Sequence, residues 1–164
     1  MTVKHSLLAL LVACLLSFEA IGQESNKTAP DKPTSNPKYD AESAQRLGAD
    51  QRGMRSYVLV VLKTGPNKVA PGKERDEMFA GHFANIKRLA AEGKLALAGP
   101  FDGVDGWRGL FVFAVKDIEE AKQLTTTDPV IMKGEMVAEY HKWYGSAAVM
   151  DVTRIHETLI EKNP

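Results

Sequence analysis

Apolar residues fall into short runs along the chain, and their pattern predicts the strands of a sheet. Tyr57–Leu62 and Gly109–Val115 are almost continuously apolar, which is typical of strands buried on both faces. Leu95–Phe101 is a shorter run that Gly99 and Pro100 bring to an end. Met136–Tyr144 alternates instead, so that one face carries Met136, Ala138 and Tyr140 and the other carries Val137, Glu139, His141 and Trp143.

A helical period separates the first two predicted strands. Its apolar positions recur at the spacing of one helix face, at Phe79, Phe83, Ile86, Leu89 and Ala90. We expect Asp76 to be the N-cap of this helix and Gly93 to end it. Asp117 should cap a second helix at Ile118–Leu124, and the Asp128-Pro129 pair should start a helical turn that ends at Gly134.

These elements follow one another in the order βαββαβ. That order predicts an α+β, ferredoxin-like fold in which two helices cover one face of a four-stranded antiparallel sheet. Tyr57–Leu62 and Gly109–Val115 are apolar on both faces, so the second face of the sheet must also be buried. The simplest cover is the same face of a second copy, and we therefore expect a homodimer.

The first 22 residues read as a signal peptide. Lys4 and His5 precede an apolar stretch, Ser6–Phe18, that is too short to span a bilayer, and small residues favour cleavage after Gly22. We expect a protein without a membrane span that is exported, periplasmic or extracellular. The alternative is a lipoprotein anchored at Cys14, the single cysteine of the chain.

Composition assigns the remaining segments. Residues 23–38 are polar and rich in proline and read as a disordered linker, followed by an N-terminal helical brace at 39–54. Residues 55–145 hold the predicted domain, and 146–164 form a C-terminal helical tail. Lysine plus arginine equals aspartate plus glutamate at 21 each, without a basic stripe, so nucleic acid is not an expected partner.

Several short motifs in this order resemble the YCII-related (YciI-like) family of small α+β proteins. They are Gly81-His82-Phe83, Glu92-Gly93-Lys94-Leu95, Ala98-Gly99-Pro100-Phe101, Arg108-Gly109, Thr127-Asp128-Pro129 and Trp143-Tyr144. The resemblance covers about residues 55–145 and implies a dimer related to the dimeric α+β barrels. It also implies a His–Asp acid–base pair, which falls on His82 and Asp128 here. The family includes an enzyme of chloroaromatic breakdown.

His82 lies on or beside the apolar face of its predicted helix. A carboxylate bonded to one imidazole nitrogen fixes the tautomer and raises the basicity of the other nitrogen, as proton transfer requires. In the alternative interpretation, a backbone carbonyl satisfies His82 and Asp128 only caps the turn at Pro129.

Four further residues are candidates for substrate binding. Pro100 and Phe101 end a strand near the same site, where they would wall a pocket or belong to the core. Arg75 and Arg108 would bind an anionic group or lie as solvated surface charges. His141 and His156 have no partner at metal-ligand spacing, and motifs for phosphate loops, nucleophile elbows and haem are absent, so we expect no metal and no cofactor.

Together these features predict an exported enzyme that uses His82 and Asp128 for cofactor-independent acid–base chemistry, such as elimination or isomerisation, on a small molecule. The alternative is a non-catalytic small-molecule-binding or stress-related dimer. The sequence does not identify the substrate.

Overall fold

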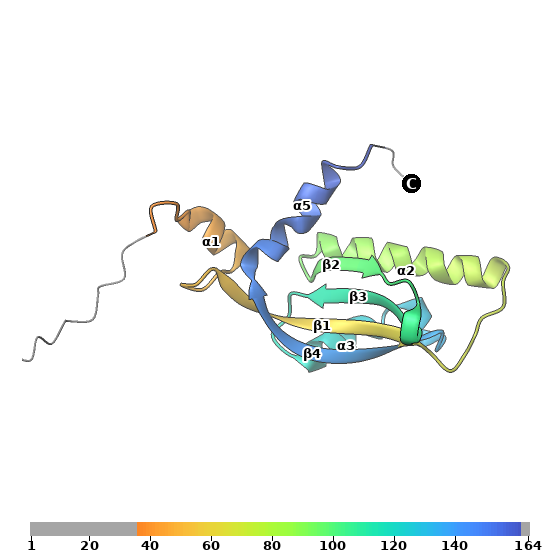
Figure 1. Ribbon diagram of the computed structural model, residues 1–164. Helices are drawn as coiled ribbons and strands as arrows, with labels where there is room; N and C mark the ends of the chain where they lie inside the picture. The colour runs from red at the N-terminus through yellow and green to blue at the C-terminus, as the bar shows by residue number, and fades with distance from the viewer. Residues whose placement is uncertain (1–35, 162–164) are drawn as a thin grey trace, which may run out of the picture. The chain divides into compact units, whose positions relative to one another are not determined.

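The computed structural model describes residues 36–161 (Figure 1). The chain divides into two units, Met1–Pro37 and Lys38–Pro164, and every element below belongs to the second. The predicted signal peptide with Cys14, and most of the predicted linker, lie outside the described residues. No helix within residues 36–161 has the length and apolar character needed to cross a membrane.

Four strands form one antiparallel sheet, which confirms the predicted fold class. Along the chain the strands are β1 (Met54–Thr64), β2 (Leu95–Pro100), β3 (Trp107–Phe113) and β4 (Met136–Ser146). Across the sheet they lie in the order β2-β3-β1-β4, and each neighbouring pair is antiparallel. The predicted end of β3 at Val115 is two residues too late. Pairing with β1 stops at Phe113, opposite Val58, and the next N–H, of Ala114, bonds to the Lys94 carbonyl instead.

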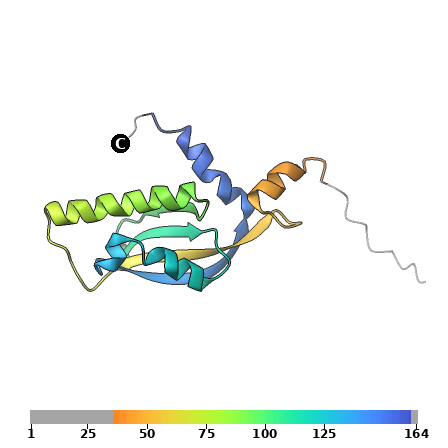
Figure 2. The same cartoon turned by 180° about the vertical axis from the view of Figure 1, so that it is seen from behind.

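Helices α2 (Lys73–Ala91), α3 (Ile118–Thr125) and α4 (Pro129–Met132) cover one face of this sheet, as Figure 2 shows from behind. The core between the layers is built from alternate strand residues and the inner faces of the helices. It includes Val58, Val60, Leu62, Met78, Leu89, Phe111, Phe113, Ala121 and Val130. Met136, Ala138 and Tyr140 also pack here, which confirms the predicted alternation of β4.

The ends of the helices follow their capping residues, with one exception. Asp117 accepts a hydrogen bond from the Glu120 N–H, and Gly93, with φ +68°, follows the end of α2 as predicted. The predicted N-cap at Asp76 is wrong, because α2 starts after Gly72 and Asp76 lies in its first turn. Gly72 has a φ of +134°, which favours glycine and lets the chain turn into the helix earlier than the apolar period indicates.

The second face of the sheet is partly covered by the chain itself. Tyr57, Ala96 and Val112 form a second cluster with Val149 and Met150 from the 3₁₀ turn η2 (Ala147–Asp151). Helix α5 (Val152–Glu157) follows, and Arg46 of α1 (Ala41–Leu47) pairs with Asp151 at 3.0 Å. Val137 and Trp143 of β4 remain exposed, so the C-terminal segment covers only part of the face for which we expected a second copy.

Candidate functional site

His82 lies on the inner side of α2 among aromatic rings. Only 7% of the residue is exposed. Its ring stacks on Phe111 of β3 with a centroid separation of 5.9 Å, and Phe79 and Phe83 flank it at 6.2 and 5.4 Å. The helical spacing of Phe79, His82 and Phe83 places all three side chains along one edge of α2, and the imidazole is held between this edge and the sheet.

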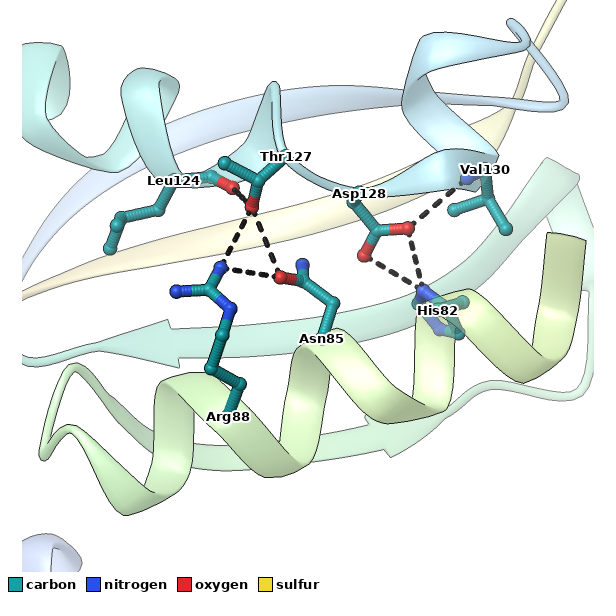
Figure 3. Close-up of polar contacts among 7 residues, drawn as sticks. All are labelled: His82, Asn85, Arg88, Leu124, Thr127, Asp128 and Val130. Carbon is teal, nitrogen blue, oxygen red and sulfur yellow. Dashed lines mark hydrogen bonds and ion pairs between the residues drawn. The ribbon is translucent and has the colours of Figure 1, made fainter.

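Asp128 meets His82 directly (Figure 3). His82 Nδ1 lies 2.8 Å from Asp128 Oδ2 and 3.0 Å from Oδ1, and Asp128 has no exposed surface. Asp128 is also the N-cap of α4, since its Oδ1 accepts a hydrogen bond from the Val130 N–H at 3.1 Å. The structure thus brings the predicted pair together, and Asp128 both caps the turn and pairs with the imidazole.

This geometry leaves one imidazole nitrogen for chemistry. An ionised carboxylate only accepts hydrogen bonds, so the hydrogen between the two groups is assigned to Nδ1 and the lone pair of the neutral ring to Nε2. No described residue forms a hydrogen bond with Nε2, and this atom is not among the buried, unpartnered polar atoms. Nε2 therefore keeps some solvent contact and has the tautomer of a general base.

Gly81 allows the turn to approach α2 this closely. A Cβ atom at this position would lie 2.9 Å from Cγ of Pro129, a distance that real Cβ atoms do not tolerate without a shift. Because Gly81 has no side chain, α4 packs against α2 at the residue that precedes His82. The Gly81-His82 and Asp128-Pro129 motifs are therefore two halves of one contact.

A second set of polar contacts binds the segment at Thr127 to α2. These contacts begin about one helical turn beyond His82. Arg88 Nη2 donates to Asn85 Oδ1 at 2.7 Å and to Thr127 Oγ1 at 3.1 Å, and the Thr127 hydroxyl donates to the Leu124 carbonyl (Figure 3). Our sequence analysis missed Asn85 and Arg88. Their spacing of three and six residues from His82 is the signal that places them on the same helix edge.

The Arg75 guanidinium is bonded to other residues of the protein and is not a solvated surface charge. Its Nη1 donates to Glu135 Oε1 at 2.6 Å and to the Val69 carbonyl at 3.0 Å, and its guanidinium lies 4.9 Å from the centroid of Phe79. Burial raises the pKa of Glu135, but the hydrogen bond from the Val69 N–H and the charge of Arg75, with that of Arg108, outweigh it and hold the pKa below its ordinary value. Glu135 was not a candidate from the sequence.

The other predicted binding residues lie at the ends of β2 and β3. Pro100 ends β2 opposite Gly109, and Phe101 packs on Trp107 at 5.4 Å with both rings partly exposed. Arg108 is half-buried. The described surface has hollows of about 410 and 400 Å³ near Arg55 and near Asp117, and neither hollow is lined by His82, Asp128 or the predicted binding residues.

Residues 36–161 contain no group of three histidine, cysteine, aspartate or glutamate side chains arranged to hold a metal ion.

Comparison with known proteins identifies the family of this chain. A sequence model of the YCII-related domain matches residues 56–143, more than half of the chain, and the protein belongs to this family. The uncharacterized protein YjpA of Bacillus subtilis (strain 168) is 29% identical over 90 residues, which cover 55% of this chain and 95% of YjpA.

Among solved structures, 5-chloro-2-hydroxyhydroquinone dehydrochlorinase (TftG) from Burkholderia phenoliruptrix AC1100, in complex with 2,5-dihydroxybenzoquinone, is similar. It has 19% sequence identity and a TM-score of 0.38, and the match covers 52% of this chain and 92% of TftG.

Proposed function

We propose that this protein is a small-molecule enzyme that uses the His82–Asp128 pair for cofactor-independent acid–base chemistry. The observation that supports this most directly is the 2.8 Å contact between His82 Nδ1 and Asp128, with no partner for Nε2 among residues 36–161. Elimination and isomerisation are the reaction types that a single base of this kind serves, because both begin with removal of a proton from the substrate.

In this proposal Nε2 takes a proton from an acidic C–H or O–H group of the substrate. The electron pair of the broken bond forms a new double bond, either expelling a leaving group in an elimination or shifting within the substrate in an isomerisation. Asp128 stabilises the imidazolium that forms. The proton then returns to the leaving group, to another substrate atom or to water, which restores neutral His82.

Solvent deuterium exchange tests the proposal without knowledge of the natural substrate. A panel of small carbonyl, phenol and enol compounds is incubated with the full chain in D₂O and followed by NMR for deuterium incorporation or product. His82→Asn should abolish any signal, and Asp128→Asn should weaken it less, because the imidazole remains. Preserved circular dichroism would show that both variants are folded.

His141→Asn is the matched control. His141 Nε2 also lies 2.8 Å from a carboxylate oxygen, Glu139 Oε1, but this pair is on the exposed second face of the sheet. Loss of turnover in His82→Asn with full turnover in His141→Asn is the expected result. Equal turnover in wild type and His82→Asn would contradict the proposal.

A second candidate function is non-catalytic binding of a small molecule. The position of the two hollows favours it, because neither is beside His82. In that case compounds would raise the midpoint of thermal unfolding without deuterium exchange or product formation, and His82→Asn would change affinity only.

A homodimer through the second face of the sheet is also part of this proposal. The exposed Val137 and Trp143 side chains support it, and the Trp143 ring packs on Tyr57 with ring centroids 5.3 Å apart. Val137→Asp should shift the protein to a monomer in sedimentation velocity, whereas Lys87→Asp on the exposed side of α2 should not. A monomeric wild-type protein would contradict the dimer.

Export completes the proposal and is supported by the sequence of residues 1–22. Intact mass of protein from a native-type host should show Gln23 at the new N-terminus. A diacylated species starting at Cys14 would establish the lipoprotein alternative instead.

A further inference from the structure

One of the two hollows, with a volume of about 410 Å³, lies at the start of β1. Its place follows from the different lengths of two neighbouring strands. Pairing with β3 ends at Phe113, opposite Val58, whereas β1 starts before this point, at Met54. Figure 1 shows β1 continuing past the end of β3 towards α1. The volume lies in the range of about 300 to 1,000 Å³ that is typical of small-molecule sites.

The backbone of β1 is open towards this hollow. The Gly53 carbonyl accepts a hydrogen bond from the Ala147 N–H, directly after β4. Because the backbone groups of successive strand residues point to opposite sides, those of Ser56 point away from β4, as those of Val58 do. Ser56 lines the hollow, and the pairing with β3 that would use its N–H and carbonyl stops at Val58. A ligand in the hollow would therefore meet free backbone groups.

Arg55 lines the same hollow and is held in place by the protein. Its Nη1 donates to the carbonyl of Leu47, the last residue of α1, at 2.8 Å. The guanidinium lies 5.2 Å from the centroid of the Tyr57 ring. An added Cβ on Gly48 would lie 3.1 Å from Nη1, so the turn after α1 packs closely on the same group. The guanidinium is thus fixed before any ligand arrives.

The other edge of the Arg55 guanidinium is unused. Nε is buried without a hydrogen-bond partner, and it is the only side-chain atom of this kind within residues 36–161. In the same part of the chain, Nη2 forms no hydrogen bond or ion pair either, and it is not among the buried unpartnered atoms. Nε and Nη2 form a fork of two parallel N–H donors, which matches the two oxygens of a carboxylate. Since a buried donor without an acceptor costs free energy, a bound carboxylate would relieve that cost.

Asp50 does not supply this carboxylate, although it also lines the hollow. Its two oxygens accept hydrogen bonds from the Tyr144 hydroxyl and from the N–H groups of Arg52 and Met54. Within residues 36–161 no ion pair joins Asp50 to Arg55. The one acidic side chain on the wall is therefore committed to the turn before β1.

Lys116 adds a second positive charge to the wall of the hollow. Its side chain is 81% exposed, and its ammonium lies 4.0 Å from the Asp117 carboxylate. This long surface contact leaves the ammonium able to turn towards a ligand. The hollow thus presents one fixed and one mobile cation, and a negatively charged ligand is favoured there.

Most of the wall lies outside the part of the chain that the family shares. The YCII-related model matches residues 56–143. Five of the nine lining residues fall outside this range: Gly48, Asp50, Met54, Arg55 and Tyr144. Neither His82 nor Asp128 lines the hollow. A ligand bound there would use residues that the proposed acid–base chemistry does not.

We propose that the hollow at the start of β1 binds a small carboxylic acid, and that Arg55 Nε and Nη2 bind its carboxylate. The Ser56 N–H is a further donor on the wall, and Lys116 attracts a second anionic group. This site goes beyond the proposed function and does not depend on it.

Succinate and succinamide test the site as probes of equal length and different charge. Succinate has one carboxylate for Arg55 and another for Lys116. Isothermal titration calorimetry of the full chain should show succinate binding at least tenfold tighter than succinamide. Arg55→Gln should weaken succinate about ten- to hundredfold, as loss of a charge-assisted hydrogen bond does. Arg55→Lys should fall between, because it keeps the charge without the fork.

Lys116→Gln tests the same site without disturbing α1. Arg55→Gln also removes the bond to Leu47, whereas the Lys116 side chain is mostly exposed. Lys116→Gln should weaken succinate about two- to fivefold, as expected for a charge screened by solvent. Lys73→Gln is the matched control, because Lys73 is an 89% exposed cation at the first residue of α2 and does not line the hollow. Its affinity should equal that of wild type.

Four results would overturn the inference. They are equal affinity for succinate and succinamide, an equal loss in Lys116→Gln and Lys73→Gln, inorganic phosphate binding as tightly as succinate, and no succinate binding up to about 10 mM, a concentration that would fill even a millimolar site.

His82→Asn separates this site from the proposed enzyme. It should bind succinate as wild type does, and a loss equal to that of Arg55→Gln would place the anion at His82 and overturn the inference. Succinate binding through Arg55 without deuterium exchange on any compound would leave this site standing and contradict the enzyme. Deuterium exchange through His82 without succinate binding would do the reverse.

Discussion

Two buried carboxylates hold the segment between α3 and β4 against the same helix, and they do so in the same way. Asp128 bonds to His82 of α2 and to the Val130 N–H, while Glu135 bonds to Arg75 of α2 and to the Val69 N–H. Each carboxylate thus has one side-chain partner on α2 and one backbone donor. Their α2 partners are two helical turns apart.

The two contacts differ in what the α2 side chain has left to offer. Arg75 is always charged, and its Nη1 already donates to Glu135 and to the Val69 carbonyl. His82 uses only Nδ1 for its contact with Asp128, and its Nε2 has no partner among the described residues. The Arg75–Glu135 pair therefore serves the structure, whereas the more deeply buried His82–Asp128 pair leaves Nε2 without a partner among the described residues.

Removal of Glu135 should have the largest effect on stability. Glu135→Ala leaves the Val69 N–H without its acceptor and the Arg75 guanidinium without its carboxylate partner, and we expect a loss of about 3 kcal/mol in the free energy of unfolding, as for other broken buried pairs. Urea denaturation measures this loss. Glu74→Ala is the control, because Glu74 pairs with Lys133 at the surface, and its midpoint should match wild type. Equal midpoints for Glu135→Ala and wild type would show that Arg75 finds another acceptor.

Asp128→Ala should follow at about 2 to 3 kcal/mol, from loss of both an N-cap and a buried hydrogen bond to the imidazole. Unlike Glu135→Ala, it should also remove most turnover, since His82 loses its orientation. Urea denaturation and the deuterium-exchange assay separate the two effects. Thr127→Ala, next in the chain and held by the partly exposed Arg88 network, should lose less stability and keep turnover. Equal losses of turnover in both variants would mean that only the position of the turn matters.

Gly81→Ala should cost about 1 to 2 kcal/mol, because the new Cβ would overlap Pro129 and push α4 away from His82. Gly99→Ala is the matched control, since a Cβ there meets no atom within 4 Å. Thermal unfolding of the two variants gives the comparison. A stability for Gly81→Ala equal to that of Gly99→Ala would show that α4 shifts freely, and the Asp128–His82 contact would then be looser than the one at Glu135.

Sequence patterns predicted the fold better than they predicted these two contacts. The spacing of apolar residues predicted the βαββαβ order, because the burial of one or both faces of an element dictates that spacing locally. The start of α2 was wrong because a glycine conformation at Gly72, not a polar cap at Asp76, decides it. Glu135 was missed because its partners, Val69 and Arg75, are 66 and 60 residues away, and no local pattern links them. The pairing of His82 with Asp128 came from family resemblance, and the structure supplies the contact.

The last prediction, with the smallest expected effect, concerns the loss of stability at Glu135 in acid. The pKa of Glu135 is lowered in the folded protein from an ordinary value of 4.5, so Glu135 contributes stability above pH 4.5. That contribution is lost as the pH falls below 4.5 through the lower folded pKa, because the unfolded chain binds the proton first. Glu135→Gln carries no titrating group at this position, so its stability should fall less steeply than that of wild type below pH 4.5.

Urea midpoints measured from pH 6 to pH 3, a range of about one and a half units on either side of an unperturbed carboxyl pKa, give the two profiles. Glu74→Gln is again the control, since a surface pair screened by solvent should leave the slope close to that of wild type. Parallel plots of stability against pH for wild type and Glu135→Gln would mean that Glu135 has the same pKa in the folded and unfolded protein. Arg75 and the Val69 N–H would then only offset the cost of burying its charge.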